Sequence, residues 1–181
     1  MNNNNKYLNL QNKNLIIMGF SGSGKTIIGK TLSELYNLPF VDTDINIQIS
    51  QNLSIQNIFR MFGEDYFRVL ETEMCKKISE LKNTVISVGG GTVLDPKNVK
   101  YLKQNGILVY LKSSPEQIYK NIQYDDSRPL LNTSNKFETI CNLLDERSHT
   151  YENISDISIS AINKSPILIA VQIQKKLQDY I

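Results

Sequence analysis

Short continuous apolar runs alternate along the chain with longer amphipathic stretches. The short runs predict strands buried on both faces of a sheet, and the longer stretches predict helices. The expected strands are Leu15–Met18, Pro39–Val41, Thr84–Val88, Ile107–Leu111 and Ile157–Ile159. The expected helices are Lys25–Tyr36, Ile55–Arg60, Tyr66–Leu81, Pro96–Gln104, Pro115–Gln123, Phe137–Asn153 and Pro166–Tyr180. This alternation predicts an α/β domain with a five-stranded parallel sheet, whose ligand site lies at the carboxyl ends of the strands.

The length of the chain favours a single folded domain. Its 181 residues are enough to bury one proper core and too few for a second unit of any size. Residues 1–13 are rich in asparagine and predict a frayed N-terminal segment, which leaves residues 14–181 as the domain. Residues 124–136 are polar and irregular in pattern, and we expect them to form a lid that closes over a ligand.

Charge, hydropathy and cysteine use narrow the setting. The formal net charge is +2, and the basic residues are scattered, which argues against a nucleic-acid partner. No apolar run is long enough to span a bilayer, and the N-terminal residues lack the features of a secretory signal. We therefore expect a cytoplasmic protein without a membrane partner. Cys75 and Cys141 lie in apolar helical contexts without zinc-site or redox-pair spacing, which predicts reduced core residues.

The strongest chemical signal is the segment Gly19–Thr26, which directly follows the apolar run Leu15–Met18. Its G-x-x-x-x-G-K-T spacing is that of a phosphate-binding loop, whose backbone N–H groups hold the phosphates of a nucleoside triphosphate. Lys25 is expected to reach the β- and γ-phosphates, and the Thr26 hydroxyl to bind Mg²⁺. An ordinary glycine turn is the alternative, but a strand precedes the segment and an amphipathic helix follows it. The apolar residues that make this helix amphipathic are Ile27, Ile28, Leu32 and Leu35.

Two further segments follow expected strands and so belong at the same edge of the sheet. In Asp42-Thr43-Asp44, one carboxylate can serve the metal and the other the hydroxyl of an acceptor. The alternative is that Thr43 or Asp44 only caps a helix that begins near Ile45. The triplet Gly89-Gly90-Gly91 brings bare backbone against a ligand, or else forms a plain turn. The strand before this triplet does not end in an acidic residue, so we expect Asp42 to support the metal instead.

Three arginines are candidates for binding an anionic substrate. Arg68 lies four residues after Glu64 on one helix, which suits either a surface ion pair or a guanidinium oriented to grip a carboxylate. Arg128 lies in the polar segment, where it either places positive charge on a transferring phosphoryl group or is simply solvated. Arg147 lies on the next helix and offers a second cation for an acidic substrate. The one histidine, His149, is expected on the surface without a partner.

Six segments together resemble the shikimate kinases in content, order and spacing, over about residues 14–177. They are Gly19–Thr26, Asp42–Asp44, Gly63-Glu64 with Phe67-Arg68, Gly89–Gly91, Arg128–Leu131 and Glu146-Arg147 through Tyr151. The resemblance implies a three-layer αβα P-loop kinase fold with sheet order 2-3-1-4-5, substrate-binding helices and a lid. It also implies a monomer that uses ATP with Mg²⁺ to phosphorylate the 3-hydroxyl of shikimate, on the route to chorismate and the aromatic amino acids.

The resemblance further implies roles for individual residues. The catalytic residues would be Lys25, Asp44 and Arg128. The shikimate-binding residues would be Asp44, Arg68, Gly89, Gly90, Gly91 and Arg147. The ATP-binding residues would be Gly22, Ser23, Gly24, Lys25, Thr26, Ile27 and Arg128, and the metal would be served by Thr26 and, through water, by Asp42.

The chain departs from the family pattern around adenine. Lys120 is the nearest candidate for an arginine that packs over adenine, and residues 160–166 lack a Thr-Asp type pair, so no adenine contact is assigned. Three other functions stay open at this point. They are a kinase for gluconate or a nucleoside monophosphate on the same scaffold, a nucleotide-operated switch, and a catalytically silent relative. Quinate is a further candidate acceptor.

Overall fold

The computed structural model of the chain describes residues 8–125 and 127–180. A sheet of five parallel strands in the order β2-β3-β1-β4-β5 forms its centre, as the resemblance implies. The strands are β1 (Asn14–Met18), β2 (Phe40–Asp42), β3 (Val85–Ser87), β4 (Gly106–Lys112) and β5 (Ile157–Ser160). The helices are α1 (Lys25–Tyr36), α2 (Thr43–Gln51), α3 (Ile55–Ile78), α4 (Pro96–Asn105), α5 (Pro115–Ile122), α6 (Lys136–Ile154) and α7 (Pro166–Tyr180), with 3₁₀ turns η1 (Thr92–Leu94) and η2 (Pro129–Leu131).

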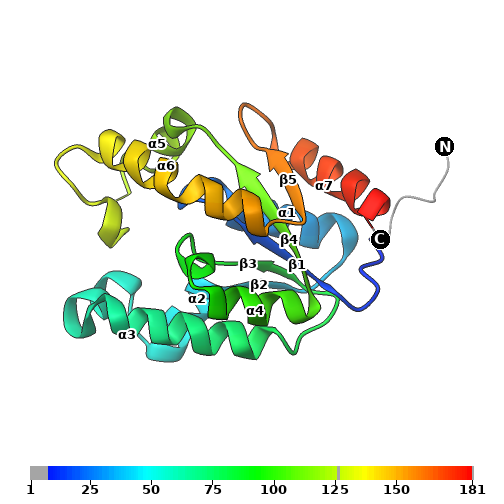
Figure 1. Cartoon of the computed structure of the whole chain (residues 1–181), viewed down its shortest axis with the longest axis horizontal. Helices are drawn as coiled ribbons and strands as arrows, with labels where there is room; N and C mark the ends of the chain where they lie inside the picture. The colour runs from blue at the N-terminus through cyan, green and yellow to red at the C-terminus, as the bar shows by residue number, and fades with distance from the viewer. Residues whose placement is uncertain (1–7, 126, 181) are drawn as a thin grey trace.

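Helices cover both faces of the sheet, which gives three layers (Figure 1). Successive residues of β1 point to opposite faces, so Leu15 and Ile17 pack with α1 and α7 in one core cluster. Ile16 and Met18 pack in a second cluster, with side chains of α3, α4, α5 and α6. Every residue of β1 is buried, because neither face of the central strand meets solvent. This explains why the expected strands read as unbroken apolar runs.

Local sequence signals fix where several helices begin. Asp95 and Ser114 accept hydrogen bonds from backbone N–H groups in the first turns of α4 and α5, and a proline follows each of them. Such caps satisfy donors that a helix start leaves free, and proline suits the first helical position. Apart from α2, which the sequence offers only as an alternative near Ile45, and from the junction inside α3, the expected strands and helices match the observed ones to within a few residues.

The structure corrects three expectations about the elements. The two helices expected on either side of residues 61–65 form one element, α3, in which Gly63 leaves helical geometry at φ 83° and ψ 172°. Residues 8–13 are not frayed, because Leu8 and Leu10 are buried in the core; residues 1–7 lie outside the described residues. In α1 the apolar stripe is narrower than expected, since Ile27 and Leu35 are exposed.

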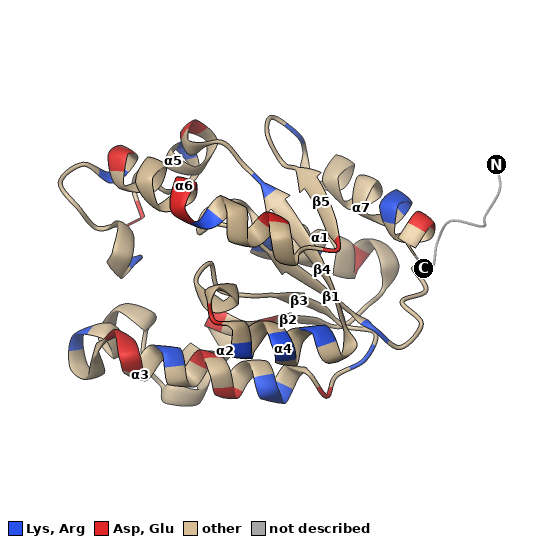
Figure 2. Ribbon diagram, in the orientation of Figure 1, with Lys and Arg blue, Asp and Glu red and all other residues tan. Residues whose placement is uncertain are grey.

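Charges and cysteines have the following places. Figure 2 shows basic and acidic residues interspersed along α3. Cys75 is buried, and burial raises the pKa of its thiol to about 12, whereas Cys141 is only partly buried and so is not a core residue. His149 is exposed, but contrary to expectation its ring nitrogen lies 2.9 Å from the side-chain amide of Asn153. Within residues 8–125 and 127–180, no helix is both long and apolar enough to cross a membrane.

Candidate active site

The phosphate loop connects β1 to α1. The backbone φ angles of Gly19, Gly22 and Gly24 are 145°, 83° and 93°, and residues other than glycine rarely adopt such positive values. Lys25 turns back over the loop, and its Nζ donates hydrogen bonds to the backbone oxygens of Gly19 (3.0 Å) and Phe20 (2.9 Å). The loop therefore holds its own lysine at the edge of the sheet, at the start of α1.

The charge of Lys25 is sensitive to its surroundings. The side chain is buried, and desolvation lowers its pKa from 10.5 to about 8. The carboxylates of Asp44 and Asp42 oppose this shift, while Arg128 adds to it. An anionic ligand beside Lys25 would favour the protonated lysine, since an opposite charge stabilises the charged form.

Asp42 ends β2 and joins two parts of the site. Its Oδ1 accepts hydrogen bonds from the backbone N–H groups of Asp44 and Ile45, so Asp42 caps α2, and neither Thr43 nor Asp44 does. Its Oδ2 accepts a hydrogen bond from the Thr26 hydroxyl at 2.7 Å. The side chain of Thr43 instead accepts a hydrogen bond from the backbone N–H of Gly89, which ties the end of β2 to the end of β3.

The donor set around Thr26 and Asp42 suits Mg²⁺ that arrives with a nucleotide. A hydroxyl and a carboxylate lie together beside the phosphate loop, and Mg²⁺ is usually bound by one or two such groups together with phosphate oxygens and water. Among the described residues, no cluster of three or more His, Cys, Asp or Glu side chains could hold a metal by itself. The residues thus fit a metal shared with phosphates better than a metal held by protein alone.

Asp44 carries a buried carboxyl group with one unpaired oxygen. Desolvation, followed by the charges of Asp42 and Glu71, raises the pKa of its carboxyl from 3.8 to about 6. Its Oδ1 is buried, and it has no hydrogen-bond partner among residues 8–125 and 127–180. Buried polar atoms in native structures normally have partners, so an unpaired oxygen at this edge of the sheet indicates a place where a donor from a ligand can bind.

The three glycines after β3 serve different purposes. A Cβ on Gly89 would lie 2.7 Å from Asp44 Oδ1 and 2.8 Å from Glu71 Oε1, so this glycine makes room for two carboxylates. A Cβ on Gly90 would lie 2.9 Å from a phosphate-loop nitrogen, and one on Gly91 would lie 2.6 Å from the Arg68 guanidinium. Gly90 and Gly91 line the cavity described next, whereas Gly89 does not.

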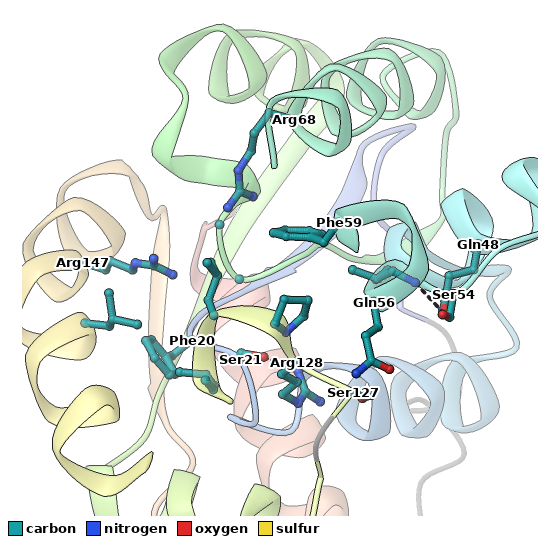
Figure 3. A pocket seen from close by; sticks show the side chains of 17 residues that line it. Phe20, Ser21, Gln48, Ser54, Gln56, Phe59, Arg68, Ser127, Arg128 and Arg147 are labelled. Carbon is teal, nitrogen blue, oxygen red and sulfur yellow. Dashed lines mark hydrogen bonds between the residues drawn. The ribbon is translucent and has the colours of Figure 1, made fainter. Parts of the chain in front are cut away.

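A cavity of about 260 Å³ opens between the phosphate loop, α3, α6 and the polar segment before η2. We call it the acceptor cavity. Figure 3 shows the side chains of Arg68, Arg128 and Arg147 around it, with the rings of Phe20 and Phe59 between them. Three cations from three separate segments therefore surround one space that also has apolar walls. This combination suits a small anionic molecule with an apolar ring face.

Arg68 is held in place by two acidic residues of its own helix. Its guanidinium contacts Glu64 Oε1 at 2.5 Å and Glu71 Oε2 at 2.5 Å. Glu71 is buried, and its other oxygen accepts a hydrogen bond from Thr92 Oγ1 at 2.5 Å. Arg68 therefore forms the helical ion pair with Glu64, and it also lines the acceptor cavity, where the binding of a substrate carboxylate stays a prediction.

Arg147 lines the acceptor cavity from α6, and Tyr151, one turn later on the same helix, contacts the backbone of Gly90. Tyr151 is buried and donates a hydrogen bond from its hydroxyl to the backbone oxygen of Gly90 at 2.7 Å. Burial raises the pKa of this phenol from 10.0 to about 12. The Nε of Arg147 is buried without a hydrogen-bond partner among the described residues, and the guanidinium lies 5.9 Å from the centre of the Phe20 ring.

Arg128 lies between two cavities. It lines the acceptor cavity and also a second cavity of about 300 Å³ beside the phosphate loop, which we call the phosphate cavity. Its Nε donates to Asp125 Oδ2 at 2.9 Å, and its Nη1 donates to the Ser21 hydroxyl of the phosphate loop. The polar segment of residues 124–136 thus brings one cation to the boundary between the two cavities.

A third cavity continues from the phosphate cavity along α5 and the start of α7. Lys120, Asn163, Lys164 and Pro166 line it, together with Gly24 and Ile27 of the phosphate loop and α1. These residues include both places at which the sequence departs from the pattern expected around adenine. The residues that depart from the family pattern therefore line the cavity next to the phosphate cavity, and Lys120 is one of them.

Comparison with known proteins agrees with this geometry. The family model described as "Shikimate kinase" matches residues 21–178. The chain belongs to the shikimate kinase family. It is 43% identical over 161 residues to a shikimate kinase of Caldicellulosiruptor saccharolyticus, which covers 89% of this chain and 93% of that protein.

Two solved structures of the family also superpose on the chain. A shikimate kinase from Acinetobacter baumannii in complex with shikimate has a TM-score of 0.90 at 30% identity, covering 93% of this chain and 94% of the other. A shikimate kinase from Aquifex aeolicus has a TM-score of 0.81 at 33% identity, covering 92% of this chain and 97% of the other. The family fold is thus present over nearly the whole chain.

Several residues that build the site of this chain were not predicted from the sequence. Glu71 and Thr92 hold Arg68 and its carboxylate partner, and Thr43 joins two strand ends. Of these three residues, only Glu71 has a sequence spacing that predicts its contact, because it lies three residues after Arg68 on the same helix. The contact between Thr92 and Glu71 joins distant segments and has no local pattern.

Proposed function

We propose that this member of the shikimate kinase family transfers the γ-phosphoryl group of ATP to the 3-hydroxyl of shikimate, giving shikimate 3-phosphate and ADP. The phosphate cavity holds the triphosphate, and the acceptor cavity holds shikimate. The observation that carries this proposal is that Arg128 lines both cavities. A residue on the shared wall is suited to a group that passes from one ligand to the other.

The acceptor cavity supplies the groups that a hydroxylated ring carboxylate requires. Arg68 and Arg147 offer cations from two sides, and planar guanidinium groups bind carboxylates with paired hydrogen bonds. Phe59 and Phe20 offer apolar surface for the ring. The backbone of Gly90 and Gly91 completes the wall near Arg68. The Asp44 carboxylate is not among the residues that line this cavity, and it lies beside Gly89, the residue before that wall.

In the transfer, the acceptor oxygen forms a bond to the γ-phosphorus while the bond between that phosphorus and the leaving ADP oxygen breaks. The proton of the acceptor hydroxyl goes to the Asp44 carboxylate. With a pKa near 6, Asp44 is largely ionised at neutral pH, yet it is a better proton acceptor than an ordinary aspartate. Lys25 and Arg128 stabilise the negative charge that develops on the oxygens of the transferring phosphoryl group.

Thr26 and Asp42 are the residues that would hold Mg²⁺. When bound with ATP, the ion supplies charge neutralisation at the β- and γ-phosphates. The closeness of the Thr26 hydroxyl and the Asp42 carboxylate, at 2.7 Å, supports this role. The proposed enzyme acts as a monomer, without nucleic-acid or membrane partners.

A coupled assay of ADP release tests the function. Mg·ATP is combined in turn with shikimate, quinate, gluconate, AMP, CMP and no acceptor, and Lys25→Ala provides the inactive control. We expect turnover with shikimate that the Lys25→Ala variant lacks. Preferred turnover with gluconate or a nucleoside monophosphate would instead assign a different acceptor to the cavity, and ATP binding without turnover on any acceptor would indicate a switch or a silent relative.

A further inference from the structure

Helix α5 packs directly against the phosphate loop, although neither the motif nor the proposed chemistry requires it to. A Cβ on Gly22 would lie 2.7 Å from Cγ2 of Ile122 and 3.5 Å from Cγ2 of Ile118. Position 22 therefore needs glycine for two reasons, its positive φ of 83° and the close approach of α5. The residue of α5 that faces the loop between these two isoleucines is Asn121.

Asn121 holds the peptide that follows Gly22. Its Nδ2 donates a hydrogen bond of 2.8 Å to the backbone oxygen of Gly22. At the other end of the same peptide, the N–H of Ser23 donates to the backbone oxygen of Phe20 at 3.1 Å. A peptide plane fixed at both ends cannot rotate freely, so the Gly22 carbonyl is directed at α5. A carbonyl oxygen turned toward the phosphate cavity would repel a triphosphate electrostatically.

A second amide supports the first. The Nε2 of Gln117, one turn earlier on α5, donates to Asn121 Oδ1 at 3.0 Å. This bond leaves Asn121 Nδ2 as the atom that faces the loop. Asn121 also lines both the phosphate cavity and the third cavity beyond it, so it lies beside the path that a nucleotide would occupy.

We propose that Asn121 is a positioning residue for nucleotide binding, which acts by holding the Gly22 carbonyl away from the triphosphate. The proposal rests on the phosphate loop binding ATP and is independent of which acceptor the enzyme uses. It makes Gln117 a supporting residue of smaller effect. Because α5 leads into the segment that carries Arg128, the same contact joins the base of that segment to the phosphate loop.

The test measures ligand affinities by isothermal titration calorimetry in the absence of any acceptor. Asn121→Leu removes the donor at similar size, and it should weaken Mg·ATP binding about three- to tenfold, as expected for one lost hydrogen bond. Asn121→Asp should weaken binding at least as much, because its carboxylate cannot donate and repels both the carbonyl and the phosphates. Gln117→Leu should weaken binding about twofold.

Magnesium tripolyphosphate, which lacks a base and a ribose, separates positioning from direct contact with the nucleoside. We expect Asn121→Leu to weaken tripolyphosphate and ATP by the same factor, while the dissociation constant of shikimate is unchanged. Gln123→Leu, two residues further along the chain and outside the lining of both cavities, is the matched control and should change none of these affinities. Loss of ATP affinity with tripolyphosphate affinity intact would overturn the proposal, as would unchanged affinity for both. Thermal unfolding confirms that each variant is folded.

Discussion

The two sides of the site are built in different ways. On the phosphate side, one continuous segment supplies both the backbone and the central cation, Lys25, which is bonded to carbonyls of that segment, and α5 adds one hydrogen bond from Asn121. On the acceptor side, the three cations come from α3, α6 and the polar segment before η2, and two of them are bonded to carboxylates. A local segment can be specified by a motif, whereas the acceptor side depends on how distant elements pack.

This difference matters for specificity. Any triphosphate presents the same anionic chain, so a backbone cradle suffices for binding it. On the proposed function, the acceptor is selected by the spacing of Arg68, Arg147 and Asp44, and packing contacts such as the one between Thr92 and Glu71 hold Arg68 in place. The following variants test whether the two sides act separately, in order of decreasing effect.

Replacing Arg128 should have the largest effect, because it is the residue that belongs to both sides. We expect Arg128→Ala to lower kcat roughly 10³-fold or more, as for other arginines that stabilise a transferring phosphoryl group. Arg128→Lys should recover only part of the loss, because lysine lacks the planar fork. Steady-state kinetics with both substrates varied measures this, and a kcat within a few-fold of the parent would contradict the shared-wall role.

Replacing Asp44 should separate turnover from ATP binding. Asp44→Asn should lower kcat about 10²- to 10⁴-fold, because the acceptor proton loses its destination, while the affinity for ATP stays nearly the same. The exposed Asp65→Asn on α3 is the matched control and should retain full activity. Calorimetric binding of Mg·ATP together with turnover measures both effects, and unaltered turnover would exclude Asp44 from proton transfer.

The raised pKa of Asp44 also predicts how pH acts. The pKa of Asp44 is about 6 in the folded protein and 3.8 ordinarily. Protonated Asp44 therefore contributes its full share to the free energy of unfolding below pH 3.8, and this share is lost as the pH rises through 6. Asp44→Asn should therefore be more stable than the parent at pH 7.5, by about 2 kcal/mol in urea unfolding. Equal stability of the two proteins would show that the carboxylate is not strained by burial.

Replacing Arg147 should affect only the acceptor side. Arg147→Leu should raise KM for shikimate about 10- to 100-fold through the loss of charge-assisted hydrogen bonds, with KM for ATP unchanged. Arg60→Leu is a suitable control, because Arg60 is exposed and does not line the acceptor cavity. A parallel rise of both KM values would mean that Arg147 supports the whole fold and not the acceptor cavity alone.

Replacing Glu71 should have the smallest effect and acts through two neighbours. Glu71→Gln loosens Arg68, so KM for shikimate should rise a few-fold. The same change removes a negative charge that raises the pKa of Asp44, so the fall of kcat/KM at acid pH should move to lower pH. A pH profile identical to that of the parent would show that Glu71 does not act on Asp44.

The comparison also explains what the sequence could predict. The phosphate loop and the acidic residues at the end of β2 lie in contiguous motifs, and the structure places them at one edge of the sheet, whereas the sheet order followed only from the family resemblance. The sequence offers Thr43 or Asp44 only as an alternative for the cap of α2, and the structure gives the cap to Asp42, because a cap depends on the exact residue at which the helix begins. The purpose of Gly89 and the burial of Leu8 and Leu10 depend on tertiary packing, which no local pattern records.

The central claim is that two separate cavities bind the two substrates and meet at Arg128. Calorimetric titration of Mg·ATP and of shikimate into Lys25→Ala and Arg147→Leu tests it most directly. The account predicts that Lys25→Ala loses affinity for ATP and keeps it for shikimate, and that Arg147→Leu does the reverse. If each variant weakened both ligands by the same factor, the division of the site into a phosphate side and an acceptor side would be wrong.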